Sequence, residues 1–143
     1  MNTFLTWSHP IIQIAAVLLG AYAMVQGIKR LAFRHNKGRI FQWKKHVKFG
    51  AIALGLWVFG LTGFYVTHTV FEATYVTENH AYIAWVIAGL SIFGLITGYV
   101  LNKIKNRYKK LALIHGVFNT VLFVFVLINL YIGIDLVRSF LFE

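Results

Sequence analysis

Histidine is the residue type in this chain with the most chemistry to offer. There are 6 histidines, no cysteine and only 4 acidic residues. A neutral imidazole binds metal ions, and its pKa near neutrality also lets it carry protons. His9, His46, His80 and His115 follow one another at intervals of 37, 34 and 35 residues. This even spacing predicts one histidine in each of four successive structural units.

Composition indicates that lipid surrounds these units. Of the 143 residues, 59% are hydrophobic and 13% charged, and the mean hydropathy is +0.69. A water-soluble domain of this size cannot bury so much apolar surface. The net charge of +10 would suggest nucleic acid in a soluble protein, but this hydropathy argues against that class of partner. The lack of cysteine excludes disulfides, iron–sulfur clusters, covalent haem attachment and thiol catalysis.

Four apolar stretches are long enough to cross a bilayer as helices, since about 20 residues span its hydrocarbon core. They cover approximately residues 7–28, 46–67, 80–101 and 111–134. The single proline leaves long helices uninterrupted. Short connections make neighbouring helices antiparallel. We therefore predict one all-α membrane domain over residues 1–143, an up-down-up-down bundle of four transmembrane helices.

The charges predict how this bundle is oriented. Eight basic residues lie between positions 29 and 48 and five between 103 and 110, so 13 of the 14 basic residues share one side, with Arg138 the exception. The acidic residues all fall on the other side: Glu72, Glu78, Asp135 and Glu143. Cytoplasmic loops carry the excess of Lys and Arg. Both termini are therefore expected on the non-cytoplasmic side.

Depth in the membrane pairs the four histidines. His9 and His80 begin the first and third spans at the outer face, whereas His46 and His115 begin the second and fourth at the inner face. Each pair belongs to diagonal helices of the bundle. Two imidazoles facing each other are suitable axial ligands for a haem iron. We expect two non-covalent b-type haems, the outer iron bound by His9 and His80 and the inner iron by His46 and His115.

Glycines on the same helix faces predict room for these haems. Positions 4, 7, 11, 14 and 18 residues after a helical residue share its face. By this rule Gly27, Gly94 and Gly98 point inward at the inner level, and Gly60 and Gly133 at the outer level. Small residues also occur at ordinary contacts between membrane helices. The glycines therefore support a haem site only because they share helix faces with the histidines.

Four further polar residues are candidates to act near the haems, because polar groups inside a membrane tend to be functional. Gln13 and Asn119 each lie one turn from a predicted ligand, and Asn129 points inward at the outer level. His68 follows His46 by 22 residues and is also expected to point inward. It is a candidate partner for a haem propionate or a proton, or an alternative ligand in place of His9 or His80.

The short motifs around these histidines resemble those of the di-haem cytochrome b561 family. They are His9-Pro10, Lys44-Lys45-His46, the segment 79–85 (NHAYIAW) and Ile114-His115-Gly116. The resemblance extends over all four spans and implies the ligand pairing stated above. Many family members add two flanking helices, whereas four spans are expected here. The four-helix form suggests a prokaryotic branch in the plasma (inner) membrane.

The resemblance also bears on partners. Family members often hold ascorbate through basic residues near the inner haem, and Lys44, Lys45, Lys48 and Arg39 lie in that region. The same residues suit anionic lipid headgroups. The acidic outer face favours a metal ion or a small basic protein as acceptor, with quinol or a protein as an alternative donor. A homodimer or a place in a larger redox complex is compatible with this.

The predicted function is single-electron transfer across the membrane, with ascorbate-, quinol- or ferric-reductase activity left open. One alternative is a mono-haem membrane subunit of a quinone-linked oxidoreductase, in which the other histidines line a quinone pocket. The other is a haem-free scaffold or transport protein. The number of haems per chain separates all three.

Overall fold

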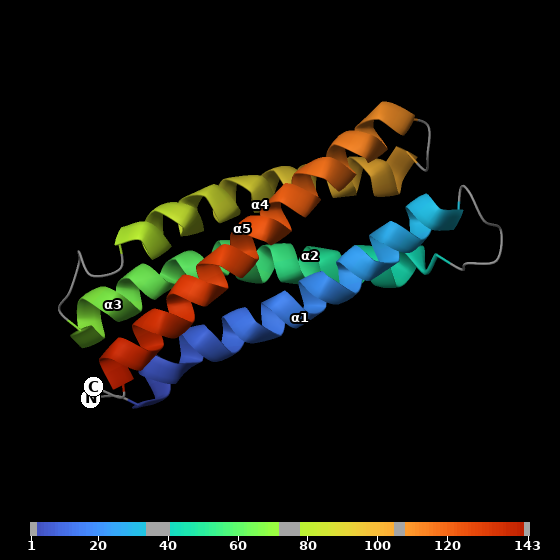
Figure 1. The fold of residues 1–143 in the computed structure, drawn as a ribbon. Coiled ribbons are helices and arrows are strands. Elements are labelled where there is room, and N and C mark those ends of the chain that lie inside the picture. Colours follow the sequence, from blue (N-terminus) through green and yellow to red (C-terminus); the bar gives the residue numbers. More distant parts are fainter. Residues whose placement is uncertain (1–2, 34–40, 72–77, 105–107, 142–143) are drawn as a thin grey trace.

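The computed structural model describes residues 3–33, 41–71, 78–104 and 108–141, and all of its regular elements are helices. Their order is α1 (Thr3–Phe33), α2 (Trp43–Phe59), η1 (Gly60–Thr62), α3 (Gly63–Phe71), α4 (Glu78–Ile104) and α5 (Lys109–Leu141). Helices α1 and α2 lie side by side along the bundle, as do α4 and α5 (Figure 1). The prediction of an all-α helical bundle is confirmed.

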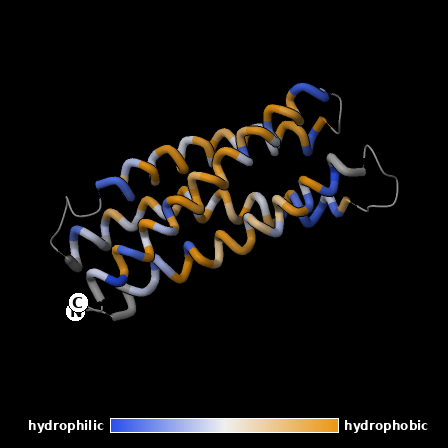
Figure 2. The backbone as a smooth tube through the Cα atoms, in the orientation of Figure 1, coloured by the Kyte–Doolittle hydropathy of each residue, from blue (hydrophilic) through white to orange (hydrophobic). Residues whose placement is uncertain are grey.

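Within the described residues, four helical stretches are long and apolar enough to cross a membrane. They are Trp7–Arg30, Trp43–Thr69, Glu78–Ile104 and Lys109–Ser139. Each contains one predicted span and extends beyond it. Their apolar residues occupy the middle of the helices and the hydrophilic ones gather toward the ends (Figure 2). This distribution suits an integral membrane protein.

The second stretch departs from the predicted uninterrupted helix. The short 3-10 helix η1 separates α2 from α3; it begins at Gly60 and is followed by Gly63. The Thr62 hydroxyl donates a hydrogen bond of 2.8 Å to the carbonyl of Phe59, three residues earlier. A 3-10 helix has three residues per turn instead of 3.6. The residues after η1 are therefore rotated relative to the positions that a continuous α-helix would give them.

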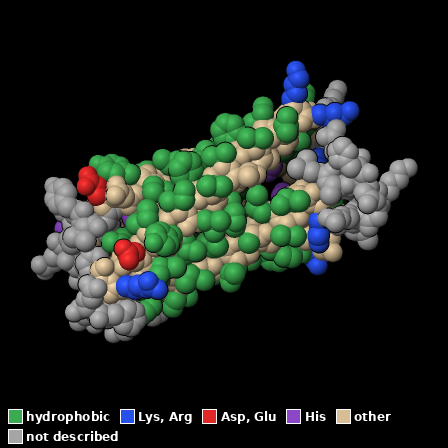
Figure 3. Space-filling view, viewed as in Figure 1, with side chains coloured by type: hydrophobic (Ala, Val, Ile, Leu, Met, Phe, Trp, Pro, Cys, Tyr) green, Lys and Arg blue, Asp and Glu red, His purple; other side chains and the backbone are tan. Residues whose placement is uncertain are grey.

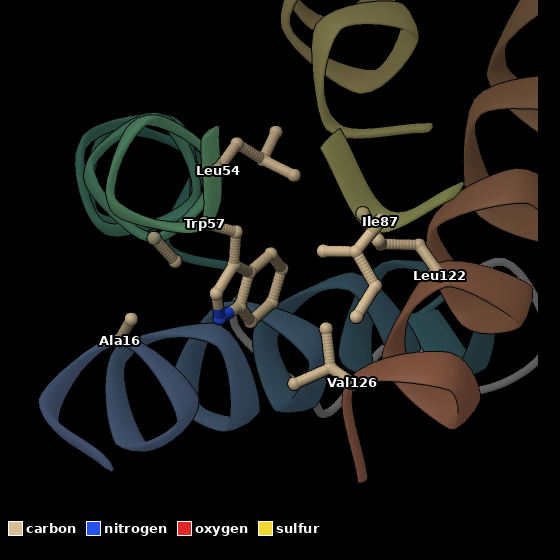
Figure 4. Close-up of a cluster of buried hydrophobic side chains, with 7 residues drawn as sticks. Ala16, Leu54, Trp57, Ile87, Leu122 and Val126 are labelled. Carbon is tan, nitrogen blue, oxygen red and sulfur yellow. The ribbon is translucent and has the colours of Figure 1, made fainter. Parts of the chain in front are cut away.

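The interior of the bundle is small and apolar. Its buried cluster comprises Ala16 of α1, Ala53, Leu54 and Trp57 of α2, Ile87 of α4, and Leu122 and Val126 of α5. Trp57 projects from α2 into the space that α1, α4 and α5 enclose (Figure 4). Large apolar side chains such as Leu18 and Tyr131 remain exposed on the outside, where a hydrocarbon environment would stabilise them.

Candidate functional site

At one end of the bundle the structure brings together His9 and His80. His9 lies in α1 and His80 in the first turn of α4. Their ring centroids are 6.3 Å apart and the ring planes are inclined at 80°. Both side chains are partly buried.

The opposite end holds a second pair of the same form. His46 in the first turn of α2 and His115 in α5 have ring centroids 6.3 Å apart and planes inclined at 78°. Histidine side chains are visible there in an opening between the helices, at the end that carries most of the Lys and Arg side chains (Figure 3). Both contacts join the histidines that the depth argument paired.

The separation within each pair suits one metal ion between two imidazoles. An imidazole nitrogen binds a first-row transition metal at about 2 Å. Ring bonds of about 1.33 Å place each ring atom about 1.1 Å from the ring centroid. Two rings on opposite sides of one metal ion therefore have centroids about 6.2–6.4 Å apart. The observed 6.3 Å in both pairs lies within this range.

A hydrogen bond at the inner pair leaves Nε2 of His46 free to bind a metal ion. His46 Nδ1 lies 2.9 Å from the carbonyl oxygen of Ala23. A carbonyl only accepts, so Nδ1 carries the proton and Nε2 keeps the lone pair that a metal needs. His115 Nδ1 lies 2.8 Å from the hydroxyl of Thr97 and 3.3 Å from the amide nitrogen of Asn119.

Each imidazole ring contacts a glycine on the neighbouring helix. A Cβ atom on Gly63 would lie 2.7 Å from Cε1 of His9, and one on Gly133 would lie 3.0 Å from Cε1 of His80. At the inner end, a Cβ on Gly27 would lie 3.4 Å from His46 and one on Gly98 would lie 3.3 Å from His115. These four glycines therefore make room for the imidazole rings. From the sequence, Gly27, Gly98 and Gly133 were expected to make room for a porphyrin.

Two other glycines leave space for the predicted amide side chains in the same way. A Cβ on Gly60 would lie 2.7 Å from Gln13 Nε2, and one on Gly94 would lie 2.8 Å from Asn119 Oδ1. Gln13 Nε2 donates to the Leu56 carbonyl at 3.2 Å, and Asn119 Nδ2 to the His115 carbonyl at 2.7 Å. Gly60 and Gly94 thus leave space for the Gln13 and Asn119 amides.

A simple geometric reason connects several of these contacts. A helical Cβ is tilted toward the N-terminus and covers the preceding turn. A glycine leaves the carbonyl four residues earlier open to a second donor. His46 uses this opening at Gly27 to reach Ala23, and Gln13 uses it at Gly60 to reach Leu56. His80 faces the Asn129 carbonyl, four residues before Gly133, although its Nδ1 does not reach a hydrogen bond of normal geometry.

The remaining predicted residues lie in different surroundings. Asn129 is buried, and its Oδ1 has no hydrogen-bond partner within the described part of the chain. His68 is exposed on α3, whereas the sequence led us to expect it to point inward. The shortened turn at η1 changes the register on which that prediction depended.

Lys44 and Lys45 are exposed beside Gln42 and Trp43 in a shallow depression. Arg39 lies outside the described residues.

Four residues at the site were not singled out from the sequence: Gly63, Thr97, Gln26 and Arg30. Gly63 is 17 residues after His46, one short of the interval of 18 that relates His80 to Gly98 and His115 to Gly133. Gln26 is 3% exposed and its Oε1 is unpartnered among the described residues. The Arg30 guanidinium lies 5.6 Å above the ring of Phe41, which in turn lies 5.6 Å from the ring of His46.

Over the described ranges, no three histidine or acidic side chains gather in a group that could hold a metal ion. The histidines stand in pairs, and a haem requires only two protein ligands because the porphyrin supplies the other four. Comparison with protein-family models, with curated proteins and with solved structures found no match.

Proposed function

We propose that this protein is a di-haem b-type cytochrome that carries single electrons across a membrane. The observation that carries the proposal is the repeated geometry of His9 with His80 and of His46 with His115. Both pairs have the ring separation that one iron requires, and they lie at opposite ends of a bundle of membrane length. Bound haem iron supplies one-electron redox chemistry at these two positions.

The protein contributes position and dry surroundings. His80 and Gly98, which contacts His115, are 18 residues apart on α4. At 1.5 Å per residue the two pairs are separated by about 27 Å along the bundle. The interval holds buried apolar side chains and includes the rings of Trp57 and Phe123, whose centroids are 6.3 Å apart. These residues exclude water between the pairs, and the two rings are candidates to shorten the electron path.

The charge distribution supports an orientation. Lys and Arg side chains gather at the end with His46 and His115, whereas the described acidic side chains lie at the other end (Figure 3). Under the positive-inside rule the former end is cytoplasmic. The chain then crosses the membrane up-down-up-down with both termini outside. We assign it to a prokaryotic plasma membrane, on the resemblance noted above.

Cationic side chains at the end with His46 and His115 could bind anionic groups. Arg30 lies against Phe41, and Lys44 and Lys45 are exposed nearby. These cations suit the haem carboxylates and an anionic or quinol donor on the cytoplasmic side. The acidic outer end suits a cationic acceptor, either a metal ion or a basic protein. A homodimer or a larger redox complex is compatible with this assignment.

Haem counting tests the proposal directly. A pyridine haemochrome assay on purified protein should give two haems per chain. One haem would favour a mono-haem subunit of a quinone-linked complex, and zero would favour a scaffold or transport protein. Either result would overturn the proposal.

Single substitutions test the pairing. His9→Ala should remove only the outer haem and His46→Ala only the inner haem. His68→Ala is the matched control, because His68 is exposed and should leave two haems in place. If His9→Ala or His46→Ala retained both haems, the pairing would be wrong.

A further inference from the structure

We infer that Thr97 is a positioning residue for the inner haem ligand His115. It acts by accepting the proton of His115 Nδ1, which fixes the tautomer and the direction of the ring. This inference rests on the proposed function, because it concerns a ligand of the proposed inner haem. It extends that function to a residue on a third helix, α4, that does not itself reach the iron.

The hydrogen-bond partners around the Thr97 hydroxyl favour one direction for its bond to His115. Thr97 Oγ1 lies 2.8 Å from the Phe93 carbonyl, 3.2 Å from the Gly94 carbonyl and 2.8 Å from His115 Nδ1. A hydroxyl has one proton to donate. Both carbonyls can only accept, and a threonine hydroxyl within a helix commonly donates to a carbonyl of the preceding turn. With the hydroxyl proton given to the backbone, we assign His115 Nδ1 as the donor to Thr97 and the lone pair to Nε2.

The amide of Asn119 completes this arrangement from the other side of the ring. Its Nδ2 donates to the His115 carbonyl at 2.7 Å and lies farther, at 3.3 Å, from Nδ1. An amide nitrogen donates and does not accept, so the Asn119 amide is bonded to the His115 carbonyl and Thr97 Oγ1 is the acceptor for Nδ1. Gly98, next to Thr97, leaves space for Cε1 of the same ring.

Because Thr97 is buried, loss of its hydrogen bond with His115 should have a measurable effect. Thr97 is 6% exposed and lies on the buried face of α4, so bulk water cannot replace it easily. His46, the other inner ligand, donates to the backbone carbonyl of Ala23, which no side-chain substitution removes. The inner pair therefore has one ligand held by backbone and one held by a side chain that can be exchanged.

Removal of the acceptor has a predictable chemical effect. A hydrogen bond from Nδ1–H to an acceptor raises the basicity of the ligating nitrogen. A more basic ligand favours the ferric state. Without Thr97 Oγ1, the ligand is weaker, and the tautomer with its proton on Nε2, which cannot bind iron, becomes competitive. The midpoint potential of the inner haem should rise, and its retention should fall.

The experiment compares Thr97→Val with Thr97→Ser in the full chain. Valine has nearly the shape of threonine but no hydroxyl, whereas serine keeps it. The matched control is Thr120→Val, since Thr120 is exposed on α5 and its hydroxyl bonds the Gly116 carbonyl at 2.9 Å. Haem content, redox titration and the low-spin ferric EPR signal are measured for each.

The expected result for Thr97→Val is a higher potential and an altered EPR signal for one haem, or loss of that haem, with the other haem unchanged. Thr97→Ser and Thr120→Val should match the unmodified protein. The inference alone would be overturned by one combination of results. In it, the unmodified protein binds two haems, and Thr97→Val has the same potentials, EPR signals and haem content. Failure of Thr97→Ser to restore the properties lost in Thr97→Val would also overturn it. An unmodified protein without haem would instead overturn the proposed function.

Discussion

The ring of His9 lies directly against the backbone of Gly63. A Cβ on Gly63 would fall 2.7 Å from Cε1 and 2.9 Å from Nδ1 of that ring. No real Cβ approaches an atom so closely, so an alanine here requires the ring or a helix to move. The position of a predicted ligand thus depends on the absence of a side chain on another helix.

Gly63→Ala should therefore weaken or abolish the outer haem site. Forcing a methyl group into such a contact costs about 1–3 kcal/mol in a packed interior. Haem content should fall toward one per chain, and thermal unfolding should move to lower temperature. Gly55→Ala is the control, because nothing lies within 4 Å of a Cβ there. Equal behaviour of the two variants would show that Gly63 does not restrict His9.

Gly20 and Trp57 should show energetic coupling. A Cβ on Gly20 would lie 2.6 Å from Cη2 and 2.7 Å from Cζ2 of the indole. Trp57 is 7% exposed and packed into the core, so the ring cannot swing away. Gly20→Ala should cost about 1–3 kcal/mol of stability, and much less in a Trp57→Phe background. A double-mutant cycle on thermal or denaturant unfolding measures this difference; simple additivity would contradict the contact.

His68→Ala should leave haem binding and stability nearly unchanged. The side chain is exposed, and surface substitutions usually alter stability by less than about 0.5 kcal/mol. The measurement is haem content together with the two midpoint potentials. Loss of one haem would show that His68, and not His9 or His80, supplies a ligand.

The absence of cysteine makes the proposed orientation testable by single-cysteine labelling. Glu78 and Lys103 are exposed near opposite ends of α4. In intact cells a membrane-impermeant maleimide should label Glu78→Cys and not Lys103→Cys. Both should react after detergent is added, and the cysteine-free parent should not. Labelling of Lys103→Cys alone would reverse the orientation.

Much of this molecule could be predicted from sequence because lipid imposes simple local rules. Long apolar runs predicted four helical stretches that are long and apolar enough to cross a membrane. The depth of His9, His46, His80 and His115 along those runs predicted which rings would meet. Depth is set by the number of residues and the helical rise, and neither depends on distant contacts.

Contacts between helices required the tertiary structure. The contact of Gly63 with His9 follows η1, which winds more tightly than an α-helix. His68, which follows η1, is exposed. Thr97 reaches His115 only because α4 and α5 pack at one particular rotation. The sequence by itself therefore determined the helices, their apolar surface and the level of each histidine. Tertiary structure decided which glycine, hydroxyl and carbonyl surround each ring, because those contacts depend on shifts of a few tenths of an ångström and on the rotation of one helix against another.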